Sequence, residues 1–208
     1  LFLSSMIAIL DYGFGNLKSV WNALDALGEE PVIVSDGSSL NDAHHLIIPG
    51  VGSYDSAINE LLNRDLVGSL HGFAKSGRPI LGICLGMQLL GDSSEEGDGA
   101  QGLGLVKGKV ERFRPELEID IPHAGWNTTQ FIREHPVFQG LPLKSDFYFV
   151  HSFRFSCEAK RVYGTTHHGE EFCSVIGYEN VLGVQFHPEK SGQVGLQVYR
   201  NFVAQLAR

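Results

Sequence analysis

Cys84 is the residue whose surroundings most strongly indicate chemistry. It lies in the segment Gly82-Ile83-Cys84-Leu85-Gly86, where a buried apolar run changes directly into a helical pattern. A nucleophile at such a strand-to-helix turn has a strained backbone, and flanking glycines avoid the collisions that a Cβ atom would cause. The turn also puts Cys84 at a helix N-terminus, where the dipole favours thiolate over thiol. The segment predicts a nucleophilic cysteine, with a buried structural cysteine as the alternative.

A histidine and a carboxylate stand two residues apart near the end of the chain, in Gln185-Phe186-His187-Pro188-Glu189. In extended backbone, residues two apart face the same way, so we expect His187 and Glu189 to project together. The proline pushes His187 into the extended region and prevents a helix. A base oriented by a carboxylate is what a nucleophile of this kind requires. The alternative is a neutral, hydrogen-bonded histidine beside a solvated glutamate.

A glycine-rich turn follows another buried run, in Pro49-Gly50-Val51-Gly52. At the carboxyl end of a parallel strand, such a turn can direct backbone N–H groups at a developing oxyanion. The amide of Leu85, which follows the nucleophile, can join them. We therefore assign a candidate oxyanion hole to Val51, Gly52 and Leu85, although an ordinary strand-to-helix turn has the same composition.

Gln88 is a candidate for binding a polar substrate. It lies four residues after Cys84, so it stands one helical turn above the nucleophile on the same face. Its neighbours Met87, Leu89 and Leu90 are apolar, and an unpartnered amide among them would carry a desolvation penalty. This favours a functional glutamine over a surface one.

The elements that must position these residues alternate in the first half of the chain. Short apolar runs alternate with helical periodicity, which is the pattern of βα units that wind a parallel sheet. We predict three helices. The first begins at Leu17, after the cap Asn16, and ends at Gly28; the second follows the N-cap Ser53; the third runs from the elbow to Leu90. The predicted strands are 6–10, 31–34, 45–49 and 79–83.

The second half changes character. An acidic, glycine-rich loop is expected at 92–104. Apolar alternation at 105–113 predicts antiparallel strands, and further β-rich runs lie at 147–150, 172–177 and 181–186, before a closing helix at about 194–207. No repeat or linker divides the chain. We predict one α/β domain over residues 6–208, with a mainly parallel sheet and added antiparallel strands. Residues 1–5, which precede Met6, are expected to be an extension outside the core.

Composition narrows the classes of partner. With 208 residues, 43% of them hydrophobic, the chain can bury a core without metals or disulfides. It has 16 basic and 24 acidic residues and no basic cluster, so we expect no nucleic acid partner. The longest apolar stretch, 79–90, is too short to span a membrane, and the beginning has no signal-peptide pattern. We therefore predict a cytoplasmic protein with no membrane partner. Three cysteines without close spacing argue against a disulfide framework or a zinc site.

Two other motifs suggest different functions. The Gly13-x-Gly15 loop follows a strand and opens a helix, as in dinucleotide-binding proteins, but Lys18 occupies the third glycine position and would hinder helix–strand packing. The pair His167-His168 suggests a metal, but adjacent side chains diverge and no further ligand spacing is present. We expect an exposed turn there and no metal site.

The Gly-x-Cys-x-Gly-x-Gln elbow with a later His-Pro-Glu resembles the class I glutamine amidotransferases. The resemblance implies a flavodoxin-like open sheet with helices on both faces, and a glutaminase that needs no cofactor. It implies a catalytic triad of Cys84, His187 and Glu189, in the same order along the chain. A regulatory subunit that had kept the fold without catalysis has no support, because all three triad positions are filled.

The resemblance also implies how glutamine is bound. In the family a backbone stretch holds the substrate, and 148–152 matches it. His151 and Ser152 therefore join Gln88 as expected substrate-binding residues.

Within the family, the chain is most similar to the glutaminase subunits of imidazole glycerol phosphate synthase, an enzyme of histidine biosynthesis. The segments that carry this likeness are 11–16, 49–52, 123–127, 148–152 and 185–191. Ala124, where many members have methionine, affects only the expected shape of its loop. Glutaminases of anthranilate, guanylate or pyridoxal phosphate synthesis stay open as alternatives.

That likeness implies a heterodimer. The partner would be a cyclase subunit that uses the ammonia to make imidazole glycerol phosphate and an aminoimidazole carboxamide ribotide. Trp126, Tyr148 and Lys190 match family positions at or near the interface.

Overall fold

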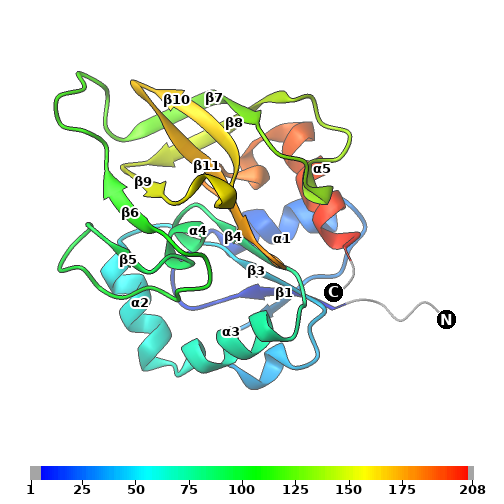
Figure 1. Ribbon diagram of the computed structural model, residues 1–208. Coiled ribbons are helices and arrows are strands. Elements are labelled where there is room, and N and C mark those ends of the chain that lie inside the picture. Colours follow the sequence, from blue (N-terminus) through cyan, green and yellow to red (C-terminus); the bar gives the residue numbers. More distant parts are fainter. Residues whose placement is uncertain (1–5, 206–208) are drawn as a thin grey trace.

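A twelve-stranded sheet runs through the structure, a computed structural model that describes residues 6–205 (Figure 1). The expected extension, residues 1–5, and the end of the predicted closing helix lie outside the described residues. The predicted α/β class is confirmed, since parallel and antiparallel strands share the sheet and helices cover it. Among residues 6–205, no helix is long and apolar enough to cross a membrane.

The parallel part of the sheet contains the strands predicted in the first half of the chain and, from the second half, the strand predicted at 181–186. In spatial order they are β2 (Val32–Val34), β1 (Ile7–Leu10), β3 (His45–Ile48), β4 (Ile80–Ile83) and β12 (Val181–Val184). Every residue of β1, β3, β4 and β12 is buried, as expected for parallel strands covered on both faces. The register pairs Gly82 of β4 with Gly183 of β12. The carboxyl ends of these two central strands therefore lie side by side.

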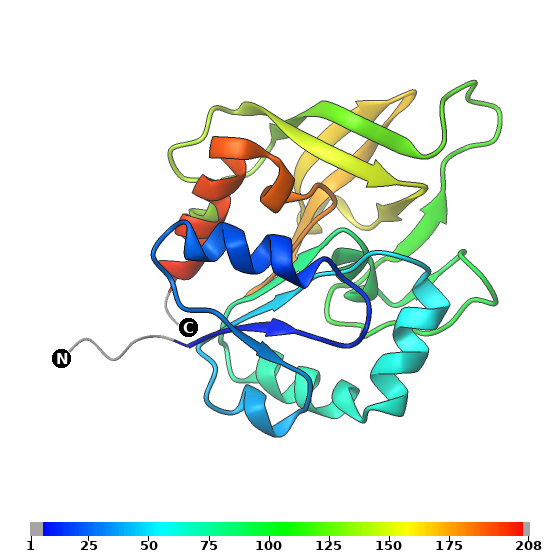
Figure 2. The same cartoon turned by 180° about the vertical axis from the view of Figure 1, so that it is seen from behind.

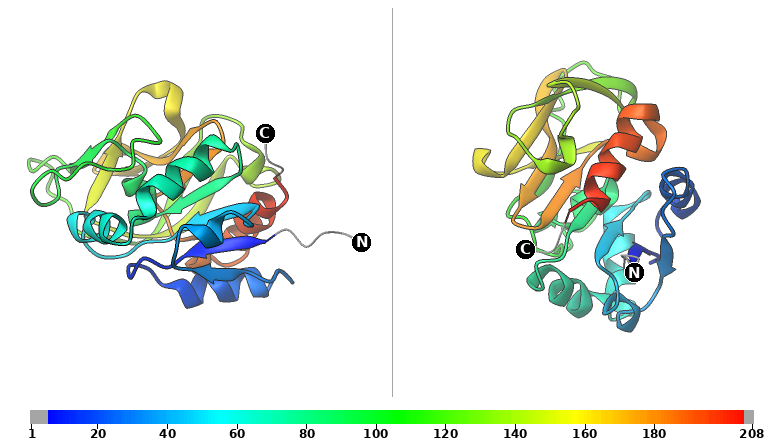
Figure 3. Two further views of the ribbon diagram at one scale, coloured as in Figure 1. Left: turned by 90° about the horizontal axis from the view of Figure 1, so that it is seen from below. Right: turned by 90° about the vertical axis from the view of Figure 1, so that its right-hand side faces the viewer.

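Helices cover both faces of the parallel part, as predicted. On one face lie α1 (Leu17–Asp25) and α5 (Gly192–Val203), and on the other lie α2 (Tyr54–Asn63) and α3 (Leu66–Lys75) (Figures 2 and 3). The alternation of β1 divides the core between them: Ile7 and Ile9 pack with Phe202 of α5, whereas Ala8 and Leu10 pack with Leu61 of α2.

The predicted helix ends are partly confirmed. Asn16 accepts a hydrogen bond from the N–H of Ser19 at 3.2 Å, which is the predicted cap of α1. Ser53 occupies the N-cap position of α2, but its hydroxyl donates to that of Ser56 at 2.7 Å and makes no capping bond. The helix α3 was not predicted. It begins after Asp65, which has a left-handed backbone (φ 54°).

The antiparallel part is more extensive than predicted. From β12 it continues through β11 (Glu170–Tyr178), β10 (Val162–His168), β7 (His123–Phe131) and β8 (Lys144–His151), with β5 (Ser93–Ser94), β6 (Lys109–Arg112) and β9 (Phe153–Ser156) beside this path. Neither β7, β9 nor β10 was predicted, because polar residues and glycines interrupt their apolar pattern. Ala124 therefore lies in a strand rather than a loop, opposite Val150. His167 and His168 also end a strand, and the turn comes at Gly169 (φ 70°).

Short helices complete the described chain. They are α4 (Leu85–Leu89) and four 3₁₀ turns: η1 (Ser38–Leu40), η2 (Pro136–Phe138), η3 (Ala159–Arg161) and η4 (Pro188–Lys190). Two of these, α4 and η4, follow the central strands β4 and β12, and the candidate catalytic residues lie there.

Candidate active site

The predicted elbow is present at the junction of β4 and α4. Cys84 has φ 54° and ψ −110°, a left-handed backbone that is rare outside glycine. Its N–H donates to the carbonyl of Val184 at 2.8 Å, which ties the turn to β12. A Cβ atom on Gly86 would lie 1.8 Å from the carbonyl oxygen of Ile48, and one on Gly82 would lie 2.7 Å from that of Gly86. The elbow therefore needs glycine on both sides because backbones approach there.

We expect Gly86→Ala to destabilise the fold by at least about 3 kcal/mol, since the carbonyl of Ile48 is main chain and cannot swing away. Gly72→Ala is the matched control: no atom lies within 4 Å of its added Cβ in α3, and the helix should gain about 0.4–1 kcal/mol. Urea unfolding of both variants measures the difference. Equal midpoints for Gly86→Ala and the parent chain would contradict the close approach.

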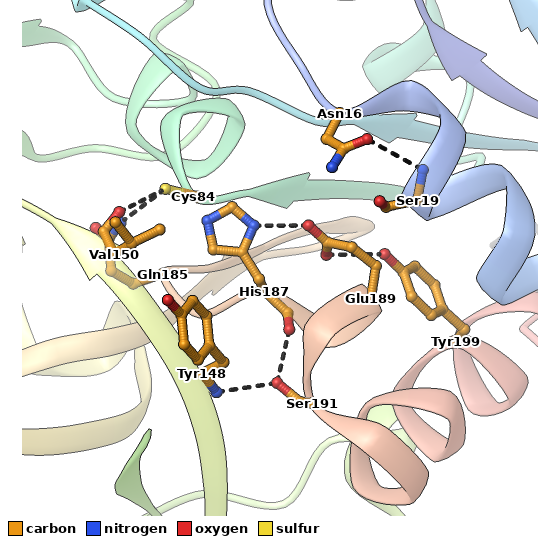
Figure 4. Close-up of polar contacts among 10 residues, drawn as sticks. All are labelled: Asn16, Ser19, Cys84, Tyr148, Val150, Gln185, His187, Glu189, Ser191 and Tyr199. Atoms are coloured by element: carbon orange, nitrogen blue, oxygen red, sulfur yellow. Dashed lines mark hydrogen bonds and ion pairs between the residues drawn. The ribbon is translucent and has the colours of Figure 1, made fainter. Parts of the chain in front are cut away.

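The imidazole of His187 lies between the sulfur of Cys84 and the carboxylate of Glu189 (Figure 4). Its Nδ1 is 2.6 Å from Oε1 of Glu189, and the other ring nitrogen faces Cys84. The side chains of His187 and Glu189 are each 2% exposed, so water does not separate them. The structure thus brings the three predicted triad residues into one line, although their catalytic role stays a prediction.

The route to this geometry differs from the predicted one. His187 has the expected extended backbone (φ −100°, ψ 97°), but β12 already ends at Val184. Glu189 lies in η4, so a turn rather than a continuing strand brings its carboxylate back to the imidazole. Pro188, which begins η4, suits this first position because it needs no N–H acceptor.

The surroundings of His187 favour its protonated form. Burial lowers the pKa of His187, but the neighbouring Cys84 with its charge and the contact with Glu189 outweigh burial and raise this pKa to about 10. The hydroxyl of Tyr199, on α5, donates to the second carboxylate oxygen of Glu189 at 3.4 Å. Burial and Glu189 hold the pKa of Tyr199 well above its usual range, so the hydroxyl remains a donor. Sequence reasoning missed Tyr199.

A main-chain clamp fixes the backbone of His187. Its N–H donates to the carbonyl of Tyr148 at 2.9 Å. The hydroxyl of Ser191 accepts from the N–H of Tyr148 at 3.0 Å and donates to the carbonyl of His187 at 2.6 Å. We call these three contacts the Tyr148–His187 clamp. It joins β8 to the start of η4 directly beside the imidazole.

A cavity of about 410 Å³ opens beside Cys84. All the residues predicted for the oxyanion hole and for substrate binding line it: Val51, Gly52, Leu85, Gln88, His151 and Ser152. Glu96 also lines it and was missed, because it lies in the acidic segment expected to be a simple loop. The structure therefore places the predicted groups around one space next to the nucleophile.

Two of the predicted substrate-binding side chains already have partners. The amide of Gln88 donates to the carbonyl of Phe153 and to Oε1 of Gln185, both at 3.2 Å. Both ring nitrogens of His151 are hydrogen-bonded: Nε2 to Nδ1 of His123 at 2.9 Å, and Nδ1 to the carbonyl of Phe153 at 2.7 Å. This leaves the backbone of His151, rather than its ring, for a substrate.

Gln185 is a further residue that sequence reasoning did not assign to the site. It is fully buried, and its amide donates to the sulfur of Cys84 at 3.7 Å. Its position in the His-Pro-Glu motif was noticed, but only the folded chain shows that it reaches the nucleophile.

The Gly13-x-Gly15 loop supports the candidate oxyanion turn. The hydroxyl of Tyr12 donates to the carbonyl of Pro49 at 2.7 Å, and the ring of Phe14 packs against Gly52. Burial and the charge of Cys84 raise the pKa of Tyr12, which stays a hydrogen-bond donor. The loop therefore packs on the turn at the end of β3, where a Cβ atom on Gly15 would lie 3.2 Å from the ring of Pro49.

The residues predicted for a partner interface form one surface. The ring of Trp126 meets that of Tyr148 edge-on, with centroids 6.3 Å apart, and Nζ of Lys190 lies 5.6 Å from the centroid of Tyr148. Trp126 is 60% exposed, which is unusual for so large an aromatic side chain. We call these three residues the aromatic–lysine surface.

Comparison with known proteins places this geometry in context. The family model for class-I glutamine amidotransferases matches residues 8–206. The chain is 46% identical to imidazole glycerol phosphate synthase subunit HisH of Sulfurimonas denitrificans, over 95% of this chain and 97% of the relative. It is 45% identical to the protein of the same name from Methanosarcina barkeri, with the same coverage.

Solved structures share the fold at lower identity. A structure of PurLQS from Thermotoga maritima has a TM-score of 0.76 at 19% identity, covering 97% of this chain and 98% of that one. A glutamine amidotransferase crystal structure has a TM-score of 0.73 at 21% identity, covering 95% and 96%.

Proposed function

The chain belongs to the class I glutamine amidotransferase family, and from this premise we propose that it is the glutaminase subunit of an imidazole glycerol phosphate synthase. The observation that carries the proposal is the buried line of Cys84, His187 and Glu189 beside a cavity. The HisH relatives, similar over nearly the whole chain, support this member of the family over the glutaminases of anthranilate, guanylate or pyridoxal phosphate synthesis.

In the proposed mechanism, the Cys84 thiolate attacks the side-chain amide carbon of glutamine. The backbone at Val51 and Gly52 and the N–H of Leu85 stabilise the oxyanion; Leu85 begins α4, so its N–H has no acceptor within the helix. Protonated His187 gives its proton to the departing ammonia. Neutral His187 then activates a water molecule, which hydrolyses the thioester to glutamate.

Glu96 supplies a carboxylate to the wall of the cavity. One of its oxygens accepts from the N–H of Tyr54 at 3.1 Å. Burial raises the pKa of Glu96. A bound cation would counteract this rise, because it favours the charged carboxylate. We propose that Glu96 binds the α-ammonium group of glutamine.

Glu96→Gln is expected to lower kcat/KM for glutamine roughly 10- to 100-fold, mainly through KM, because it removes a charge-assisted hydrogen bond worth about 1.5–3 kcal/mol. Steady-state measurement of glutamate formation tests this. Glu95→Gln is the matched control: Glu95 is exposed, accepts from the N–H of Arg112 and does not line the cavity. Similar losses in the two variants would remove Glu96 from the substrate site.

The proposed partner is the cyclase subunit. Ammonia released into water near pH 7 becomes mostly ammonium and is no longer a nucleophile, so the glutaminase benefits from docking on the enzyme that uses it. The aromatic–lysine surface supports this proposal, since aromatic side chains provide contact area and a lysine provides a specific pairing. It is also joined to His187 through the Tyr148–His187 clamp.

We expect the isolated chain to hydrolyse glutamine slowly and to be stimulated when the cyclase subunit and its nucleotide ligand are added. A coupling of a few kcal/mol, acting on the barrier, changes the rate by roughly 100-fold. Lys190→Ala should leave the triad in place but uncouple the two reactions, so that glutamate forms faster than imidazole glycerol phosphate. Measuring both products in the reconstituted complex tests the partner and the surface together.

Lys160→Ala is a suitable control, because Lys160, on η3, is exposed, forms an ion pair with Glu158 and is not part of the aromatic–lysine surface. Equal amounts of the two products in Lys190→Ala, or full activity of the free chain, would favour a stand-alone amidase.

We propose that residues 6–208 form one domain and that the protein acts in the cytoplasm. The three cysteines of the chain are free thiols, which fits a reducing compartment.

A further inference from the structure

Cys157 and Cys173 lie on one side of the antiparallel part of the sheet. The pairing of β9 with β11 sets Phe155 opposite Cys173, so these two side chains point the same way. Cys157 follows Phe155 by two residues, and both cysteines pack against the same apolar cluster as Phe155. Residues that are 16 positions apart in the sequence thus meet in the fold.

A cavity of about 290 Å³ gives access to both thiols. Cys157 and Cys173 line it together with Arg154, Glu171 and Phe172, and both cysteines are half-buried. Among the described residues, none that lines this cavity also lines the one beside Cys84. The thiol pair is therefore a feature separate from the glutaminase site.

The two thiols are chemically unequal. The side-chain hydrogen bond from Cys157 lowers the pKa of Cys173 and burial raises it, while the backbone N–H of Cys157 and the charge of Arg154 also lower it, so that the pKa is lowered overall. That same hydrogen bond, followed by burial, raises the pKa of Cys157. Cys173 is thus the better nucleophile, and Cys157 is a protonated neighbour in contact with it.

We propose that Cys157 and Cys173 form a redox modification site, in which a hydroperoxide converts the two neighbouring thiols into a reversible disulfide. The Cys173 thiolate attacks the peroxide, the O–O bond breaks, and hydroxide or alkoxide leaves Cys173 as a sulfenic acid. The sulfur of Cys157 then attacks Cys173; an S–S bond forms, and the departing hydroxide takes the proton of Cys157 and leaves as water. Two electrons pass from the thiols to the peroxide, and a dithiol reductant reverses the change.

The experiment uses the full chain with Cys84→Ala, so that only these two thiols remain. After hydrogen peroxide treatment and denaturation, both free thiols should be lost together. The monomer should lose the mass of two hydrogen atoms, and a peptide map should show Cys157 linked to Cys173. Dithiothreitol should restore both thiols. Persistent thiols, or a link only between two chains, would overturn the proposal.

Single serine variants in the same background separate the two roles. With Cys157→Ser, the sulfenic acid on Cys173 should persist and be trapped by a 1,3-dicarbonyl reagent. With Cys173→Ser, Cys157 should react at least about 10-fold more slowly. Equal rates would contradict the assigned roles, and circular dichroism shows that each variant is folded. Cys157→Ser with Cys173→Ser in the otherwise native chain should keep full glutaminase activity, so this test stands apart from that of the proposed function.

Discussion

Replacing Cys84 by alanine should abolish glutamine hydrolysis, with a loss of at least about 10,000-fold in kcat, because no other group can form the thioester. Cys84, at the end of β4, is 6% exposed, and its sulfur faces the imidazole of His187. Alanine is smaller than cysteine, so the fold and partner binding should be retained. Glutamate release over hours, compared with the parent chain, gives the residual rate.

The other two cysteines serve as controls for this variant. Cys157→Ala and Cys173→Ala should keep full activity, since neither residue lines the cavity beside Cys84. Appreciable glutaminase activity in Cys84→Ala, or a comparable loss in either control, would require a different nucleophile.

His187→Asn is expected to reduce kcat roughly 10,000-fold, because one side chain both donates the proton to ammonia and activates the water. Glu189→Gln should cause a smaller loss, roughly 100- to 1,000-fold, since the Tyr148–His187 clamp still holds the backbone while the ring loses its orienting charge. Initial rates at saturating glutamine give both values. A Glu189→Gln chain slower than His187→Asn would reverse the assigned roles.

Tyr199→Phe is the control for Glu189. It removes only a hydroxyl at 3.4 Å from the carboxylate and should change kcat by less than about 10-fold. The proton on His187 provides a second readout. Burial lowers the pKa of His187 and Cys84 raises it, so Cys84→Ala should shift the imidazole titration, followed by NMR, to lower pH. An unchanged titration would mean that the thiolate does not stabilise the imidazolium.

The parts of the site that the sequence predicts are those carried by short local patterns. The Cys84 elbow is local because a sharp turn restricts its own neighbours to glycine, and the His187-Pro188-Glu189 segment is local because proline restricts the backbone. Even there, the route differed: η4 replaces the expected end of β12. The local glycine and proline patterns therefore predicted which residues meet, but not the backbone path that brings them together.

The residues that were missed reach the site only through tertiary packing. Gln185, Tyr199 and Glu96 reach the site only after β12, α5 and the acidic segment pack around Cys84 and Glu189. Likewise, polar residues interrupt the apolar pattern of β7, β9 and β10, so the sequence of each resembles a loop until neighbouring strands supply the hydrogen bonds. The meeting of Cys157 with Cys173 is another consequence of strand pairing that spacing in the sequence does not reveal.

The Tyr148–His187 clamp has a consequence for how related chains can diverge. Apart from the hydroxyl of Ser191, it consists of peptide groups, so it does not depend on which side chain stands at position 148. A descendant could exchange the ring of Tyr148 to suit a different partner while the position of the His187 imidazole stayed the same. The ring that would contact a partner and the imidazole that would transfer protons are thus connected through the backbone, yet each can be changed separately by mutation or by design.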